Sequence, residues 1–214
     1  MSPGTRRVAA ALLLAPASGQ AAGPSFEAAF ATRGGPAQFH ARVLYRGPDG
    51  VHRLELWREN DARLRRDVDG RLTTVATHRA GDPAYRLDLF DHTRRIHSVV
   101  DRDSLYRQGR FVDWAGLAYG LHRPMAGYTL RPATVRPPIA PFAPCRWYAL
   151  VTGGCQSLIC WSGAEAFPLL ILDQTGRPVW RVLALDHRPA TAGLFRPDAR
   201  GYVLNDAAAD ISGD

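Results

Sequence analysis

Alternation of polar and apolar residues is the feature that most constrains how this chain folds. In QFHARVLYR, apolar residues take every second position from Phe39 to Tyr45, and the positions between them include His40 and Arg42. A period of two is that of a strand with one buried face. The pattern recurs up to His187, interrupted by turn sequences such as GPDG and Asp69-Gly70. These interruptions are typical of antiparallel hairpins.

The number of such segments predicts a mostly-β (α+β) fold. Counting them gives about eleven strands in one antiparallel sheet. Two stretches break the period: SFEAAFATRG predicts a short helix at 25–34, and 101–121 predicts one helix or a broken pair because Gly109 weakens its middle. The expected strands are 38–46, 51–59, 63–68, 71–78, 85–91, 94–100, 128–131, 145–150, 155–160, 167–173 and 178–187.

The N-terminus has the pattern of a secretory signal peptide. Arg6 and Arg7 precede an apolar run from Val8 to Ala15, and small residues follow up to Gly23. This run is too short to span a bilayer, and cleavage is expected near Ala21 or Ala22. The sequence therefore predicts a signal peptide at 1–22 and a single soluble, exported domain at 23–214.

The charge pattern argues against a nucleic-acid partner. The formal net charge is +7, and every basic residue other than histidine is arginine. The arginines alternate with acidic residues, as at 63–67 and 86–88, which is typical of solvated strand faces rather than of a basic stripe.

All three cysteines lie between 145 and 160. If 145–150 and 155–160 pair around a loop of Val151–Gly154, Cys145 lies opposite Cys160 and Cys155 points to the other sheet face. An exported compartment is oxidising, which favours a Cys145–Cys160 disulfide with Cys155 left free. A Cys145–Cys155 bond remains the rival. Metal binding fits poorly, because the spacings are not C-x2-C and no histidine lies between 123 and 186.

No catalytic motif is visible: GxSxG, the P-loop, GxGxxG and HExxH are all absent. We therefore expect no enzyme activity, no cofactor and no metal site. A curved sheet with few helices should instead leave a concave apolar surface for a ligand, although each of its side chains taken alone is more simply explained as core. The candidate cavity residues are Val43, Tyr45, Leu54, Leu56, Leu87, Leu89, Ile96 and Trp114, with Arg42, Arg66 and Arg86 facing an anionic head group.

Several segments, in this order, resemble a known superfamily. They are the apolar leader, RLRRDVDG followed by YRLDLFD, the helical insert, and FPLLILDQTGRPVWRVLAL ahead of FRPDARGY. Over residues 26–198 the chain resembles the periplasmic lipoprotein-carrier superfamily of LolA, LolB and RseB. The resemblance implies an unclosed half-barrel of eleven antiparallel strands, with helices as a lid over an apolar cavity for acyl chains. It implies a periplasmic location in the bacterial envelope and no catalytic residues.

Three functions follow as hypotheses. The first is a periplasmic carrier or sensor that binds a lipid, a lipoprotein acyl chain or another hydrophobic ligand. The second is an adaptor for envelope stress or assembly that contacts a membrane protein through sheet edges or Cys155. The third is metal binding by histidines and Cys155.

Overall fold

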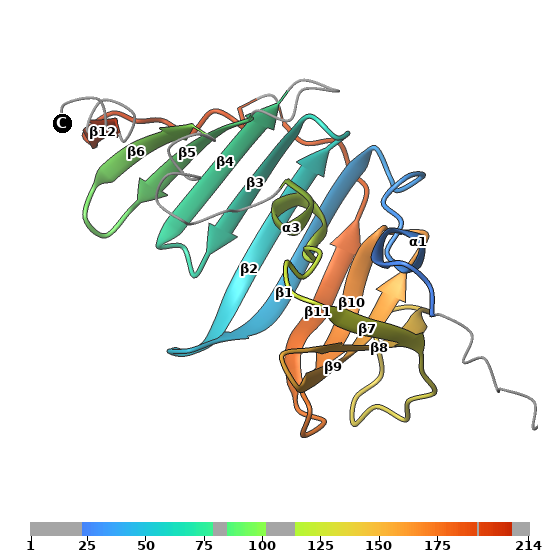
Figure 1. Cartoon of the computed structure of the whole chain (residues 1–214). Helices are drawn as coiled ribbons and strands as arrows, with labels where there is room; N and C mark the ends of the chain where they lie inside the picture. The colour runs from blue at the N-terminus through green and yellow to red at the C-terminus, as the bar shows by residue number, and fades with distance from the viewer. Residues whose placement is uncertain (1–22, 79–84, 102–113, 192, 207–214) are drawn as a thin grey trace, which may run out of the picture.

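A single sheet of twelve strands forms the molecule (Figure 1). The computed structural model describes residues 23–78, 85–101, 114–191 and 193–206. The strands are β1 (Gln38–Gly47), β2 (Gly50–Glu59), β3 (Arg63–Val68), β4 (Leu72–His78), β5 (Tyr85–Asp91), β6 (Ile96–Asp101), β7 (Tyr128–Pro132), β8 (Arg146–Thr152), β9 (Cys155–Ser162), β10 (Phe167–Leu172), β11 (Pro178–Asp186) and β12 (Val203–Asp206).

The sheet consists of two consecutive meanders. Strands β1 to β6 each pair with the next antiparallel strand, and so do β7 to β11. One pairing, β1 with β11, joins the two meanders, and its register shifts between Arg42 and Val43. The predicted mostly-β, unclosed antiparallel sheet is confirmed. It has one strand more than expected, since β12 adds a parallel pairing to β6.

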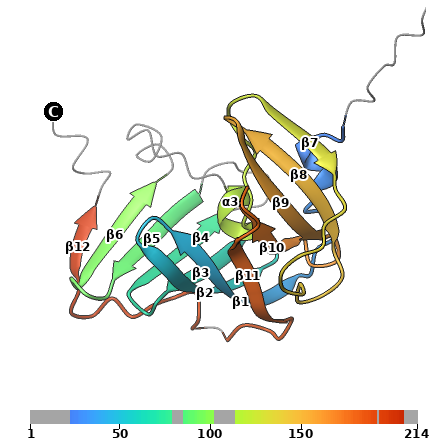
Figure 2. The same cartoon turned by 90° about the horizontal axis from the view of Figure 1, so that it is seen from below.

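Two short helices lie on the hollow side of the bent sheet (Figure 2). The predicted helix at 25–34 is observed as α1 (Phe26–Ala29), whose N-cap Ser25 accepts a hydrogen bond from the amide of Ala28. The second predicted helical stretch contains α3 (Trp114–Tyr119), and its residues 102–113 lie outside the described part of the chain. No helix among the described residues is long and apolar enough to cross a membrane.

The buried side chains form two clusters. The first lies around the helices and brings Phe26, Phe30 and Leu117 against strand residues such as Leu87 and Trp161. The second lies where the two meanders meet and includes residues of β1, β2, β10 and β11. Most strand residues of both clusters are at apolar positions of the period-two pattern, which explains why the alternation located this part of the core. The strand β10 is an exception, because its consecutive residues Phe167 to Leu170 are all buried.

A C-terminal strap, residues 188–191 and 193–202, crosses the convex side of the sheet. Its Phe195 is only 6% exposed, and the Arg63 guanidinium lies 4.7 Å from the centre of that ring. The Nη1 of Arg65 donates to the carbonyl of Leu194 at 2.9 Å, and the Tyr202 hydroxyl lies 2.6 Å from Nδ1 of His92. The strap leads directly into β12, which explains how a strand so late in the chain reaches the edge of β6.

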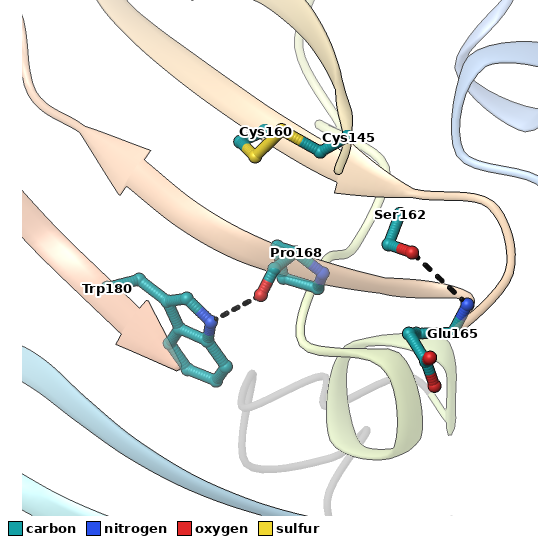
Figure 3. The surroundings of a disulfide bond; sticks show 6 residues. All are labelled: Cys145, Cys160, Ser162, Glu165, Pro168 and Trp180. Atoms are coloured by element: carbon teal, nitrogen blue, oxygen red, sulfur yellow. Dashed lines mark hydrogen bonds between the residues drawn. A yellow bond between two sulfur atoms is a disulfide. The ribbon is translucent and has the colours of Figure 1, made fainter. Parts of the chain in front are cut away.

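The predicted Cys145–Cys160 disulfide is present (Figure 3). Cys155 is free and exposed. The expected register of this hairpin is wrong. Thr152 pairs with Cys155, so the loop has only Gly153 and Gly154, both with positive φ as a two-residue hairpin turn requires. Cys160 is thus opposite Trp147 rather than Cys145, and the bond runs diagonally across a Cα–Cα distance of 5.4 Å.

Candidate ligand-binding site

The predicted cavity residues on the apolar strand faces differ in how deeply they are buried. Val43, Leu54 and Leu56 are at most 2% exposed and belong to the cluster at the junction of the meanders. Leu87 is also buried, in the cluster around the helices, and Leu89 packs against that cluster. These side chains are therefore interior packing first, and only partly exposed residues can contact a ligand without rearrangement.

Tyr45 and Arg66 are half-buried on the same concave face. In the sheet, Arg66 pairs with Leu56 on one side and Thr74 on the other. Burial lowers the pKa of Arg66, and nearby Tyr45 partly offsets this. Burial likewise raises the pKa of Tyr45. No carboxylate among the described residues pairs with the Arg66 guanidinium, so this cation lies in the hollow with an incomplete set of partners.

Arg42 and Arg86 lie on the opposite, convex face. Arg42 pairs in register with Glu55 and lines a surface groove of about 790 Å³ beside Leu183. Arg86 is exposed and donates to Asp88, with Nη2 3.0 Å from Oδ1. The structure therefore brings only Arg66, of the three predicted arginines, to the hollow side.

Ile96 is half-buried on the hollow side, opposite Asp91 of β5. Trp114 begins α3 and is also half-buried. Its Nε1 donates to Oδ1 of Asp61 at 2.6 Å, and the Tyr119 hydroxyl donates to the same oxygen at 3.1 Å. Asp61 lies in the turn between β2 and β3, so one carboxylate fastens both ends of α3 to the sheet. Burial is the main reason that the pKa of Tyr119 is raised to about 12.

Arg58 fixes the same helix from beneath and was not identified from the sequence. Its side chain is 2% exposed, and Nη1 donates to the Ala118 carbonyl at 2.9 Å while Nη2 donates to the Glu165 carbonyl at 3.3 Å. The guanidinium lies 4.5 Å from the Phe39 ring centre and 4.2 Å from that of Tyr119. Burial lowers its pKa. A buried cation between two rings thus holds α3 and the β9–β10 turn at fixed positions.

A cavity of about 570 Å³ lies between α1 and α3. Its walls are mostly apolar and include Phe26, Phe30, Leu121 and Trp161. At its rim, Nη1 of Arg123 donates to Oε1 of Glu27 at 3.0 Å, and both side chains are more than half exposed. None of the predicted cavity residues lines this space. The helical pattern at 25–34 does, however, correspond to one of its walls.

Four of the described histidines, His40, His52, His97 and His187, lie against carboxylates rather than against one another. Within the described ranges no group of three His, Cys, Asp or Glu side chains is arranged to hold a metal ion. His40 lies 3.0 Å from Glu55 and 3.1 Å from Asp186, and His97 lies 2.9 Å from Asp88. The metal-binding hypothesis thus gains no support from their placement.

Comparison with known proteins adds information on the fold alone. No protein-family model matches the chain, and no curated protein matches its sequence. Among the solved structures that match, the crystal structure of MucB aligns with a TM-score of 0.41 and 16% sequence identity, over 82% of this chain and 62% of MucB. The aligned part is thus less than two thirds of MucB's own length.

Proposed function

We propose that this protein binds a lipid or another hydrophobic ligand in the hollow of its bent sheet, as a periplasmic carrier or sensor. The observation that supports this most directly is the cavity of about 570 Å³ between α1 and α3. Ligand pockets typically enclose a few hundred to about 1,000 Å³ and have mostly apolar walls. The proposed location is supported by the disulfide, which persists in oxidising compartments, and by the apolar leader sequence.

The polar rim of the cavity can open at low cost in free energy. Both side chains of the Glu27–Arg123 ion pair at its rim are exposed, and exposed ion pairs contribute little to stability. The helix α1 can stay in place, because Phe26 and Phe30 anchor it in the core around the helices. Against this small cost, burial of an acyl chain contributes about 0.8 kcal/mol for each CH₂ group.

Farther along the same face, we propose that Tyr45, Leu89 and Ile96 extend the binding wall. Each is partly exposed in the described structure, unlike Val43 or Leu54. Arg66 would give this wall one cationic contact.

The test uses a variant that fills the cavity. Ala115 lines it from α3, so Ala115→Trp should weaken binding of an environment-sensitive apolar probe at least about tenfold, because the new indole occupies the ligand's space. The matched control is Ala126→Trp at an exposed position outside the cavity, which should bind the probe as the wild type does. Native mass spectrometry of freshly purified protein should also detect bound lipid.

If the wild-type protein is purified without bound lipid and binds no apolar probe, the proposal is wrong.

The second candidate, a protein-binding adaptor, rests on the exposed Cys155 thiol and on β12, where Val203 is 69% and Leu204 64% exposed. Recovery of a stable protein partner without lipid, from the same non-reducing preparation, would favour the adaptor.

A further inference from the structure

A second cavity lies beside α1. It encloses about 460 Å³, and Tyr148 and Trp161 form part of its wall next to Cys145 of the disulfide. It shares Trp161 and three residues of the 28–33 segment with the cavity between α1 and α3. The two spaces therefore adjoin, with the short helix and the Trp161 ring between them.

The second cavity differs from the first in that its lining has two arginines and no carboxylate. Arg33 and Arg146 both line it, and its lining includes no acidic residue. Arg33 also borders the cavity between α1 and α3, and a third cavity of about 320 Å³ beside Arg58 and Asp61. One exposed guanidinium thus lies where three cavities meet.

Neither arginine is neutralised within the described structure. No hydrogen bond or ion pair joins the guanidinium of Arg33 or Arg146 to a described residue, whereas Arg123 pairs with Glu27 across the neighbouring cavity. Arg58, which borders the third cavity, likewise has a partner, because its Nη1 donates to the Ala118 carbonyl at 2.9 Å. Two unpaired cations beside an apolar space set up an amphipathic binding site.

We propose that Arg33 and Arg146 bind the anionic head group of an acyl-chain ligand whose chain occupies the cavity between α1 and α3. Guanidinium groups match carboxylate and phosphate geometry and form charge-assisted hydrogen bonds with them. The adjoining cavity supplies the apolar wall that the chain needs. This inference rests on the proposed function and adds the chemical class of the ligand: a carboxylate or a phosphate attached to a long acyl chain.

The experiment titrates the mature chain with three ligands that share a sixteen-carbon chain. Palmitate carries a carboxylate, lysophosphatidylglycerol carries a phosphate, and monopalmitoylglycerol carries no charge. Arg33→Gln and Arg146→Gln should each weaken binding of an anionic ligand about tenfold, and the double variant about a hundredfold, because each removes a charge-assisted contact. Binding of monopalmitoylglycerol should not change. Whichever anionic ligand binds more tightly identifies the head group.

The matched control is Arg181→Gln, which removes an exposed arginine of β11 that lines none of the three cavities. Circular dichroism and thermal melting establish that each variant is folded, and Arg33→Met and Arg146→Met, which also remove the charge, replace any that is not. The head-group assignment is overturned if the variants at 33 and 146 behave like Arg181→Gln, or if they weaken the uncharged ligand equally. If the wild type binds none of the three ligands, the proposed function itself fails.

Discussion

At the scale of single residues, Arg58 shows how a cation becomes part of a core. Its charge lies between the Phe39 and Tyr119 rings, and its donors reach the backbone carbonyls of Ala118 and Glu165. Aromatic faces attract cations most strongly where water is excluded. The residue therefore combines packing, ring contacts and hydrogen bonds at the point where α3, β2 and the β9–β10 turn meet.

Replacement of Arg58 by alanine should lower the free energy of unfolding by about 3 kcal/mol or more, since it leaves a cavity and two unpaired carbonyls. Chemical denaturation measures this change. Arg53→Ala serves as the control because Arg53 is exposed, and surface changes usually stay within about 0.5 kcal/mol. Equal free energies of unfolding for Arg58→Ala and Arg53→Ala would show that Arg58 does not stabilise the fold.

At the scale of elements, His52 connects two hairpin turns. Its Nδ1 lies 2.8 Å from Oδ2 of Asp69 in the β3–β4 turn, and its Nε2 lies 2.8 Å from Oδ1 of Asp49 in the β1–β2 turn. Only the protonated imidazolium can donate to both carboxylates at once. Hydrogen bonds to Asp69 and then to Asp49 raise the pKa of His52.

This linkage predicts a dependence on pH. A pKa raised by folding means that the contribution of His52 to stability is complete below the pKa of a histidine in the unfolded chain, about 6.5, and is lost as pH rises through the higher folded value. The stability difference between wild type and His52→Gln should therefore shrink from pH 5.5 to pH 8.5, as followed by thermal melting. His122→Gln, at an exposed histidine, should show no such trend. A constant difference across this range would contradict the linkage.

Strand parity decided how much of the site could be predicted. Arg42 shares its side of β1 with His40, and Arg86 alternates with Tyr85 and Leu87, so the period alone already placed both away from the apolar face. Arg66 alternates with Arg65 and is two residues from Leu64, which placed it on the hollow side, where it lies.

Other features depend on contacts between distant segments. The cavity between α1 and α3 combines residues near 26–33, 115–123 and 161, and no local pattern relates them. The strand β12 is four residues long and exposes Val203 and Leu204, so it lacks the alternation that marked the others. The turn of the cysteine hairpin has two residues rather than the expected four, because Gly153 and Gly154, both with positive φ, form a complete turn by themselves.

At the scale of the whole molecule, the C-terminal strap holds the back of the first meander. Phe195 packs beneath Arg63, and Tyr202 contacts both the Phe90 ring, at a centroid distance of 5.6 Å, and His92. Since the strap ends in β12, its contacts connect the middle of the sheet, where β11 ends, to the edge at β6. Loss of the strap's anchor should therefore affect the stability of the whole sheet.

Phe195→Ala should lower the free energy of unfolding by about 3 kcal/mol, the usual cost of removing a buried phenyl ring. It should also speed cleavage of the strap by a protease in the native state. Phe142→Ala, at a ring that is 48% exposed, is the matched control and should have a smaller effect on both measurements. A Phe195→Ala protein as stable and as resistant as the control would show that the strap lies on the sheet without holding it.

The single pairing between the meanders also has a consequence for biogenesis. His40 and Asp186 are neighbours across the β1–β11 pair although 146 residues separate them in the chain. During synthesis, β1 therefore emerges early with one of its edges unpaired, and that edge can pair wrongly until β11 follows. We therefore expect the nascent chain to need holdase chaperones until β11 has been synthesised.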